Sequence, residues 1–146
     1  MKTVLQRFGI DSKSKPVSTL LAPHFKLSAL MSPTIDDAKR QMDHVPYANV
    51  VGALMYAMVC TRPDISHAVN MVSRYMHNPG KGHWQAVKWI LRYIQGTVDV
   101  GLKFERDQTV DKHIIGYVDS DYAGDLDKRR STTGYVFTIA GGPVSW

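Results

Sequence analysis

The residues best suited to chemistry in this sequence are Asp119 and Asp121, within the stretch GYVDSDYAGD. The apolar residues 114–118 precede them and predict a buried strand that ends at the two carboxylates. Because side chains alternate along an extended chain, both carboxylates would face the same side. Several carboxylates holding a pair of Mg²⁺ ions can stabilise the attacking and leaving oxygens of phosphodiester cleavage. The pair therefore predicts the beginning of a metal site.

A second interpretation of the same stretch is an acidic turn. Asp125 and Asp127 follow in a predicted loop, and the basic residues 128–130 come directly after them. Aspartate is common in turns because its carboxylate accepts hydrogen bonds from nearby backbone N–H groups. The spacing of the aspartates leaves both interpretations open.

The elements expected to position these residues are short strands. Apolar alternation with a period of two predicts strands at 102–104, 113–118, 133–139 and 143–146. Gly141 and Gly142 predict a hairpin between the last two. Such a sheet would expose an apolar edge, which is a template for aggregation.

Upstream, the hydrophobic period changes to that of helices, predicted at 47–60, 64–78 and 82–95. The third helix has two different faces. Its apolar face consists of Trp84, Val87, Leu91 and Ile94, and its polar face of Lys81, Gln85, Lys88, Arg92 and Gln95. The basic stripe Lys81, Lys88 and Arg92 predicts either a solvated face or a surface that contacts nucleic-acid phosphates. Trp89, on its flank, is expected either in core packing or against a sugar or base.

Composition is that of a globular chain. Of 146 residues, 44% are hydrophobic and 21% charged, and the net charge of +5 is compatible with a polyanionic partner. The single cysteine, Cys60, excludes a disulfide framework and predicts a buried thiol. The longest apolar stretch, 50–60, is too short to span a bilayer. The first ten residues carry no apolar core of a secretion signal, so we expect an intracellular protein.

Two long stretches resemble a known family. YANVVGALMYAMVCTRPDISHAVNMVSRYMHNPGKGHWQAVKWILRYIQGT and GYVDSDYAGDLDKRRSTTGYVFTIAGGPVSW are similar to the Pol polyprotein of copia-type LTR retrotransposons. They match where its reverse transcriptase ends and its ribonuclease H begins. The opening VLQRFGIDSKSKPVSTLLAPHFKLS resembles the segment that leaves the polymerase palm, so the resemblance covers essentially the whole chain.

The resemblance implies an α+β fold with four parts. Residues 1–46 would be an extended connector from the polymerase palm, and 47–98 a helical, thumb-like subdomain that grips the template–primer duplex. Residues 99–112 would be a connection, and 113–146 the truncated start of a ribonuclease H-like antiparallel sheet.

The same resemblance implies that no catalysis is to be expected. Asp119 matches the first metal-binding aspartate of ribonuclease H. The family needs a further glutamate and two aspartates, which would follow Trp146, and the polymerase aspartates would precede Met1. We therefore expect at most weak Mg²⁺ binding at Asp119 and Asp121, no other cofactor, no small-molecule substrate and weak binding of nucleic acid through Lys81, Lys88 and Arg92.

A second resemblance concerns stand-alone chains from the same copia segment that are classed among the secreted RxLR effectors of oomycete plant pathogens. It implies secretion into a host cell, an unidentified host protein as partner and suppression of defence or cell death. The sequence has no R-x-L-R string. The nearest, Trp89-Ile90-Leu91-Arg92, lies within a predicted helix and is better explained by helix packing.

Overall fold

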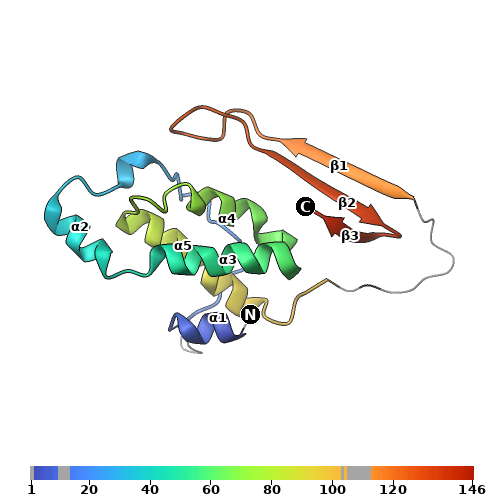
Figure 1. Cartoon of the computed structure of the whole chain (residues 1–146), viewed down its shortest axis with the longest axis horizontal. Helices are drawn as coiled ribbons and strands as arrows, with labels where there is room; N and C mark the ends of the chain where they lie inside the picture. The colour runs from blue at the N-terminus through green and yellow to red at the C-terminus, as the bar shows by residue number, and fades with distance from the viewer. Residues whose placement is uncertain (1, 10–13, 103, 105–112) are drawn as a thin grey trace.

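A helical unit is followed by a three-stranded antiparallel sheet, which confirms the predicted α+β class (Figure 1). The computed structural model describes residues 2–9, 14–102, 104 and 113–146. The helices are α1 (Lys2–Arg7), η1 (Ala29–Met31), α2 (Asp36–Asp43), α3 (Tyr47–Thr61), η2 (Pro63–Ile65), α4 (Ser66–Ser73) and α5 (Lys81–Gly96). The helices predicted at 47–60 and 82–95 are confirmed as α3 and α5.

The helix predicted at 64–78 is shorter than expected. It begins with the single turn η2, whose first residue is Pro63, and α4 then ends at Ser73. The backbone continues in tight turns, in which the N–H groups of Tyr75 and Met76 donate to carbonyls three residues earlier, at 3.3 and 3.2 Å. Arg74 and Tyr75, which lie in these turns, contact Asp125 and Asp127 in the loop between the first two strands.

The hydrophobic core lies entirely within the helical unit. Residues with no exposed surface include Val50, Val51, Leu54, Ile65, Val69, Val72, Val87, Ile90 and Ile94. Full burial of such a side chain stabilises a fold by roughly 1.5–3 kcal/mol. The buried core cluster contains no residue of the sheet. The sheet must therefore be held to the helices by other means.

Residues 1–46 are not simply the extended connector predicted from sequence, because they contain α1, η1 and α2. Residues 14–28 lie along α5, and Leu27 among them is fully buried. Three α5 side chains bond to carbonyls of this segment: Arg92 to Lys15, Trp89 to Thr19 and His83 to Ser28. Much of this N-terminal part is therefore integral to the helical unit.

A buried guanidinium connects α3, η2 and α5. Arg62 is 1% exposed and donates to both carboxylate oxygens of Asp64, at 2.8 and 2.7 Å. It also donates to the carbonyl and hydroxyl of Thr97, at 3.1 and 2.8 Å. Partial burial acts to raise the pKa of Asp64, but the hydrogen bonds and charge of Arg62 outweigh it and lower that pKa. Tyr93 completes the group by donating to Asp64 at 3.1 Å.

The sheet has the strand order β1-β2-β3, with β1 (Ile114–Ser120), β2 (Thr133–Ile139) and β3 (Gly142–Ser145). The prediction that β1 is buried is wrong, because all seven of its residues are exposed. β1 pairs only with β2 within the described chain, so its apolar side chains lie on an open edge. The strand predicted at 102–104 does not form at Leu102 or Phe104, and Lys103 is outside the described residues.

The predicted hairpin forms one residue earlier than expected. Its turn is Ala140–Gly141, and Gly142 is already the first residue of β3. Both turn residues have positive φ, 49° and 76°, as a type I′ turn requires. That backbone twist matches the twist of the two strands, which favours the turn despite the cost of placing alanine there.

We predict that Arg62→Ala lowers the free energy of unfolding by about 3 kcal/mol, because it leaves a partly buried carboxylate unpaired and a cavity beside it. Arg62→Lys should recover little, since an ammonium cannot bond to two carboxylate oxygens and to Thr97 in one plane. Urea denaturation measures both.

The control is Arg40→Ala, which removes an exposed i,i+3 pair with Asp37 and should leave the urea midpoint nearly unchanged. An Arg62→Ala protein as stable as the parent would show that the Arg62–Asp64 pair does not hold the helices together.

Candidate nucleic-acid interface and acidic loop

Asp119 and Asp121 lie where the sequence places them, at the end of β1. Both line a cavity of about 710 Å³ between the sheet and the helical unit, which Asp64 and His67 also line. Asp119 Oδ1 accepts from the N–H of Ser120 at 2.8 Å. Within the described chain, no three His, Cys, Asp or Glu residues are grouped so that they could hold a metal ion.

Asp121 fixes the loop between β1 and β2. Its Oδ1 accepts from the N–H of Thr132 at 2.6 Å and from that of Gly124 at 3.4 Å. A Cβ at Gly124 would collide with the same carboxylate and would require it to shift. One oxygen of Asp121 thus has the role that the acidic-turn interpretation assigns to it. Metal binding at Asp119 and Asp121 stays a prediction.

Asp125 and Asp127 attach this loop to the helical unit. Asp127 accepts from the N–H of Ala29 with both oxygens, at 2.9 and 3.0 Å, and from the hydroxyl of Tyr75 at 3.0 Å. Arg74 lies 3.6 Å from the carboxylate of Asp125 and donates to the hydroxyl of Thr132 at 2.8 Å. Sequence reasoning assigned these two aspartates to a loop and missed their contacts with residues far away in the chain.

A buried histidine supports the attachment point. His83 is fully buried and stacks on Tyr75 with ring centroids 4.0 Å apart. The N–H of Gly80 donates to Nδ1 at 2.9 Å, which leaves the Nε2–H to donate to the carbonyl of Ser28 at 3.0 Å. Burial lowers the pKa of His83, while burial and the bond to Asp127 raise the pKa of Tyr75 to about 12.

The predicted basic stripe lies along α5, but its three members differ. Lys81 and Lys88 are exposed. Arg92 is half-buried, donates to the carbonyl of Lys15 at 2.6 Å and lies 5.3 Å from the ring centroid of Trp89. From Lys81 to Arg92 the helix rises about 16 Å. Nucleic-acid binding by the stripe stays a prediction.

Trp89 packs within the protein, which is one of the two environments predicted for it from sequence. Its indole N–H donates to the carbonyl of Thr19 at 2.8 Å, and its ring contacts Phe25 edge-on with centroids 5.7 Å apart. These contacts leave little of the ring for a nucleotide. The predicted burial of Cys60 is wrong, because the residue lies on an exposed face of α3.

No helix among the described residues is long and apolar enough to cross a membrane. The string Trp89-Ile90-Leu91-Arg92 is part of α5, where Ile90 and Leu91 are buried in the core. Helix packing accounts for it, as the sequence predicts.

Comparison with known proteins shows that the chain belongs to the Pol polyprotein family of copia-type retrotransposons. It is 56% identical over its whole length to the Pol polyprotein of transposon TNT 1-94 from Nicotiana tabacum, of which it spans 11%. It is 41% identical over 91% of its length to that of transposon RE2 from Arabidopsis thaliana, of which it spans 8%. The chain thus corresponds to a small part of these polyproteins.

The chain is also 50% identical, over 72% of either length, to a protein of Plasmopara viticola named secreted RxLR effector protein 161. No protein-family model matches the chain, and no solved structure resembles it significantly.

We predict that the free energy of unfolding falls as the pH drops below about 6.5, with His83 as one cause. Burial holds its pKa below that of an unfolded histidine, so the unfolded chain takes up the proton first and acid favours unfolding. This contribution of His83 to stability is present above the pKa that His83 has in the unfolded chain. It is lost as the pH falls through the lower pKa that His83 has in the folded protein.

Urea titrations between pH 7.5 and 5 test this. His83→Gln should weaken the pH dependence, whereas the exposed control His77→Gln should retain it. An equal pH dependence in all three proteins would contradict the assignment to His83.

Proposed function

We propose that these residues form a nucleic-acid-binding, non-cleaving part of a retrotransposon Pol protein. In this proposal residues 47–98 act as the polymerase thumb and residues 113–146 as the start of the ribonuclease H domain. The identity of 56% along the whole chain with the tobacco Pol polyprotein is the observation that carries the proposal. Reverse transcription requires contact with nucleic acid, and a thumb grips the duplex near the polymerase site.

The geometry of α5 supports the thumb role. Its apolar face is buried in the core, so its orientation is fixed, and Lys81 and Lys88 are held on the opposite, exposed face. Positioned lysines release counterions from a phosphate backbone, which favours binding of any sequence. Such sequence-independent binding suits a protein that copies an arbitrary template.

The acidic residues support the absence of cleavage in this part of the protein. Two-metal hydrolysis needs several carboxylates that converge on the ions. Asp121 uses one oxygen to hold the loop, and Asp125 and Asp127 are turned toward Arg74 and Tyr75. Asp119 would therefore be left with too few neighbours to hold two Mg²⁺ ions.

We predict that Lys81→Gln with Lys88→Gln weakens binding to an RNA–DNA hybrid and flattens its salt dependence. If both lysines contact phosphates, the slope of log affinity against log salt should fall by about 1 to 2. Fluorescence anisotropy at 50–200 mM salt measures the slope.

The matched control is Lys39→Gln with Arg40→Gln, which removes the same two charges from α2, where both residues pair with helix aspartates. Equal slopes for the two double variants would show that net charge alone matters and would defeat the assignment to α5.

A second candidate is a pathogen effector that acts in host plant cells. The similarity to the Plasmopara viticola protein favours it, because the chain covers 72% of that relative. None of the residues described above supplies a translocation signal, so this candidate depends on that similarity alone.

Expression in plant leaf together with a cell-death inducer tests the effector candidate. An effector of this kind should reduce the necrotic area, and the Arg62→Ala variant should lose the effect because the helical unit is destabilised. Undiminished necrosis with the folded parent chain would remove the candidate.

A further inference from the structure

The acidic and basic residues of the loop between β1 and β2 differ in their contacts. Its tip carries three consecutive basic residues, Lys128, Arg129 and Arg130, all exposed. The carboxylates of Asp125 and Asp127 are engaged in other contacts. Asp125 accepts from the N–H groups of Asp127 and Lys128 at 2.9 and 3.1 Å, and Asp127 is bound to Ala29 and Tyr75. None of the ion pairs found among the described residues involves the three tip cations.

The loop is attached beside the N-terminal end of α5. Asp127 bonds to the N–H of Ala29, the first residue of η1, and η1 packs against α5. Ser28, immediately before η1, accepts the hydrogen bond of His83 in the first turn of α5. Lys81 begins α5. The tip cations and the α5 lysines are therefore carried by segments that adjoin one another.

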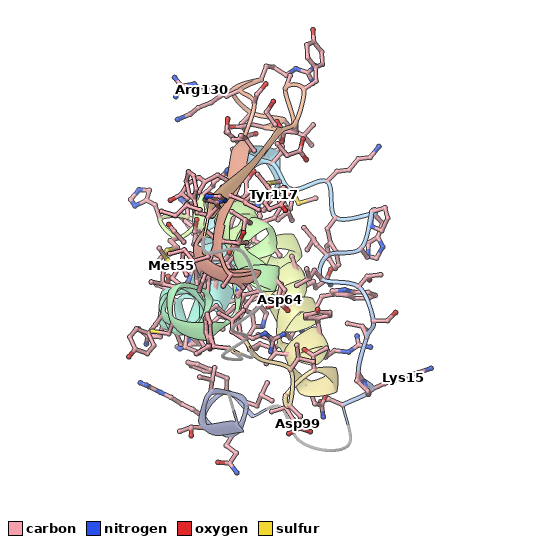
Figure 2. All side chains as sticks on the ribbon, turned by 90° about the vertical axis from the view of Figure 1, so that its right-hand side faces the viewer. Lys15, Met55, Asp64, Asp99, Tyr117 and Arg130 are labelled. Carbon is pink, nitrogen blue, oxygen red and sulfur yellow. The ribbon has the colours of Figure 1, made fainter. Side chains whose placement is uncertain are left out.

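Figure 2 shows Arg130 in the upper part of the view and Lys15, whose carbonyl accepts a hydrogen bond from Arg92 of α5, in the lower part. Below the tip lies a cavity of about 600 Å³, lined by Arg74, Lys128 and Arg130 and by the hydroxyl-bearing residues Ser131 and Thr132. Asp125 and Asp127 also line it, but the hydrogen bonds described above already engage their oxygens.

We infer that Lys128, Arg129 and Arg130 form a second phosphate-contacting site for nucleic acid, which extends the surface of Lys81 and Lys88 beyond the end of α5. The inference extends the proposed function to a different element, and the two can fail separately. Two sites on one protein bind one strand more tightly than either alone, because the second contact is intramolecular. Asp127 is the positioning residue, since it fixes the loop to η1.

The test uses the full chain and an RNA–DNA hybrid long enough to reach both regions. Changing Lys128, Arg129 and Arg130 to Gln together should lower affinity about tenfold or more at 100 mM salt, and lower the salt slope by about 1 to 3. The control changes Arg7, Lys39 and Arg40 to Gln, which removes the same charge from α1 and α2. Urea midpoints are measured first, and Lys128→Gln with Arg130→Gln replaces a triple variant that does not fold.

Comparison with the α5 variant separates the two proposals. Loss in the loop variant alone supports the loop site and contradicts the α5 site. Loss in the α5 variant alone overturns the loop site, as does an equal loss in the loop variant and its control. Competition by polyglutamate as effective as competition by nucleic acid, at equal charge concentration, would also overturn it.

Asp127→Ala tests the positioning role. This change makes the net charge more positive, so a purely electrostatic effect would tighten binding. Loss of the bonds to Ala29 and Tyr75 should instead weaken it several-fold and speed hydrogen exchange at the amide of Ala29. Tighter binding with unchanged exchange would show that the loop needs no attachment.

Discussion

The buried Arg62–Asp64 pair is the interaction on which the arrangement of the helices depends. A guanidinium withdrawn from water requires hydrogen-bond acceptors, and in this fold η2 and the C-terminal end of α5 supply them. Asp64 provides two, and the main chain and side chain of Thr97 provide the rest. The pair therefore fixes where α5 lies, and with it the direction in which Lys81 and Lys88 point. In the TRPDI string that carries the family resemblance, arginine and aspartate act as a structural clamp.

The sheet is held in a different way. Its contacts with the helical unit include the polar bonds of Asp125, Asp127 and Thr132, and the bond from the indole of Trp146, which donates to the carbonyl of Met58 at 2.9 Å. Its apolar residues remain largely exposed, and the core cluster contains none of them. Interfaces of this polar kind commonly allow relative movement of the parts they join. The helical unit should accordingly resist unfolding more strongly than the sheet.

Much of this fold could be predicted from sequence where periodicity is strong. α3 and α5 carry clear helical patterns, and β2 a clear alternation, so their positions were correct to about a residue. The predictions were wrong where contacts between distant parts of the chain determine burial or the end of an element. β1 has the apolar composition of a buried strand, but no layer of the described chain covers it. α4 ends at Ser73, and the next two residues, Arg74 and Tyr75, contact the loop. The roles of Asp127 and His83 could not be predicted, since they depend on contacts with Ala29 and Ser28, more than 50 residues away.

We propose that this part of a Pol protein binds nucleic acid through cations held by α5 and the β1–β2 loop and does not cut it. The most direct measurement is an anisotropy titration of the full chain with an RNA–DNA hybrid over a salt series, followed by incubation of the complex with Mg²⁺. We expect log affinity to fall linearly with log salt, with a slope whose magnitude is at least about 3, and the hybrid to stay intact. Absence of binding at 50 mM salt, or cleavage that Asp119→Asn abolishes, would contradict it.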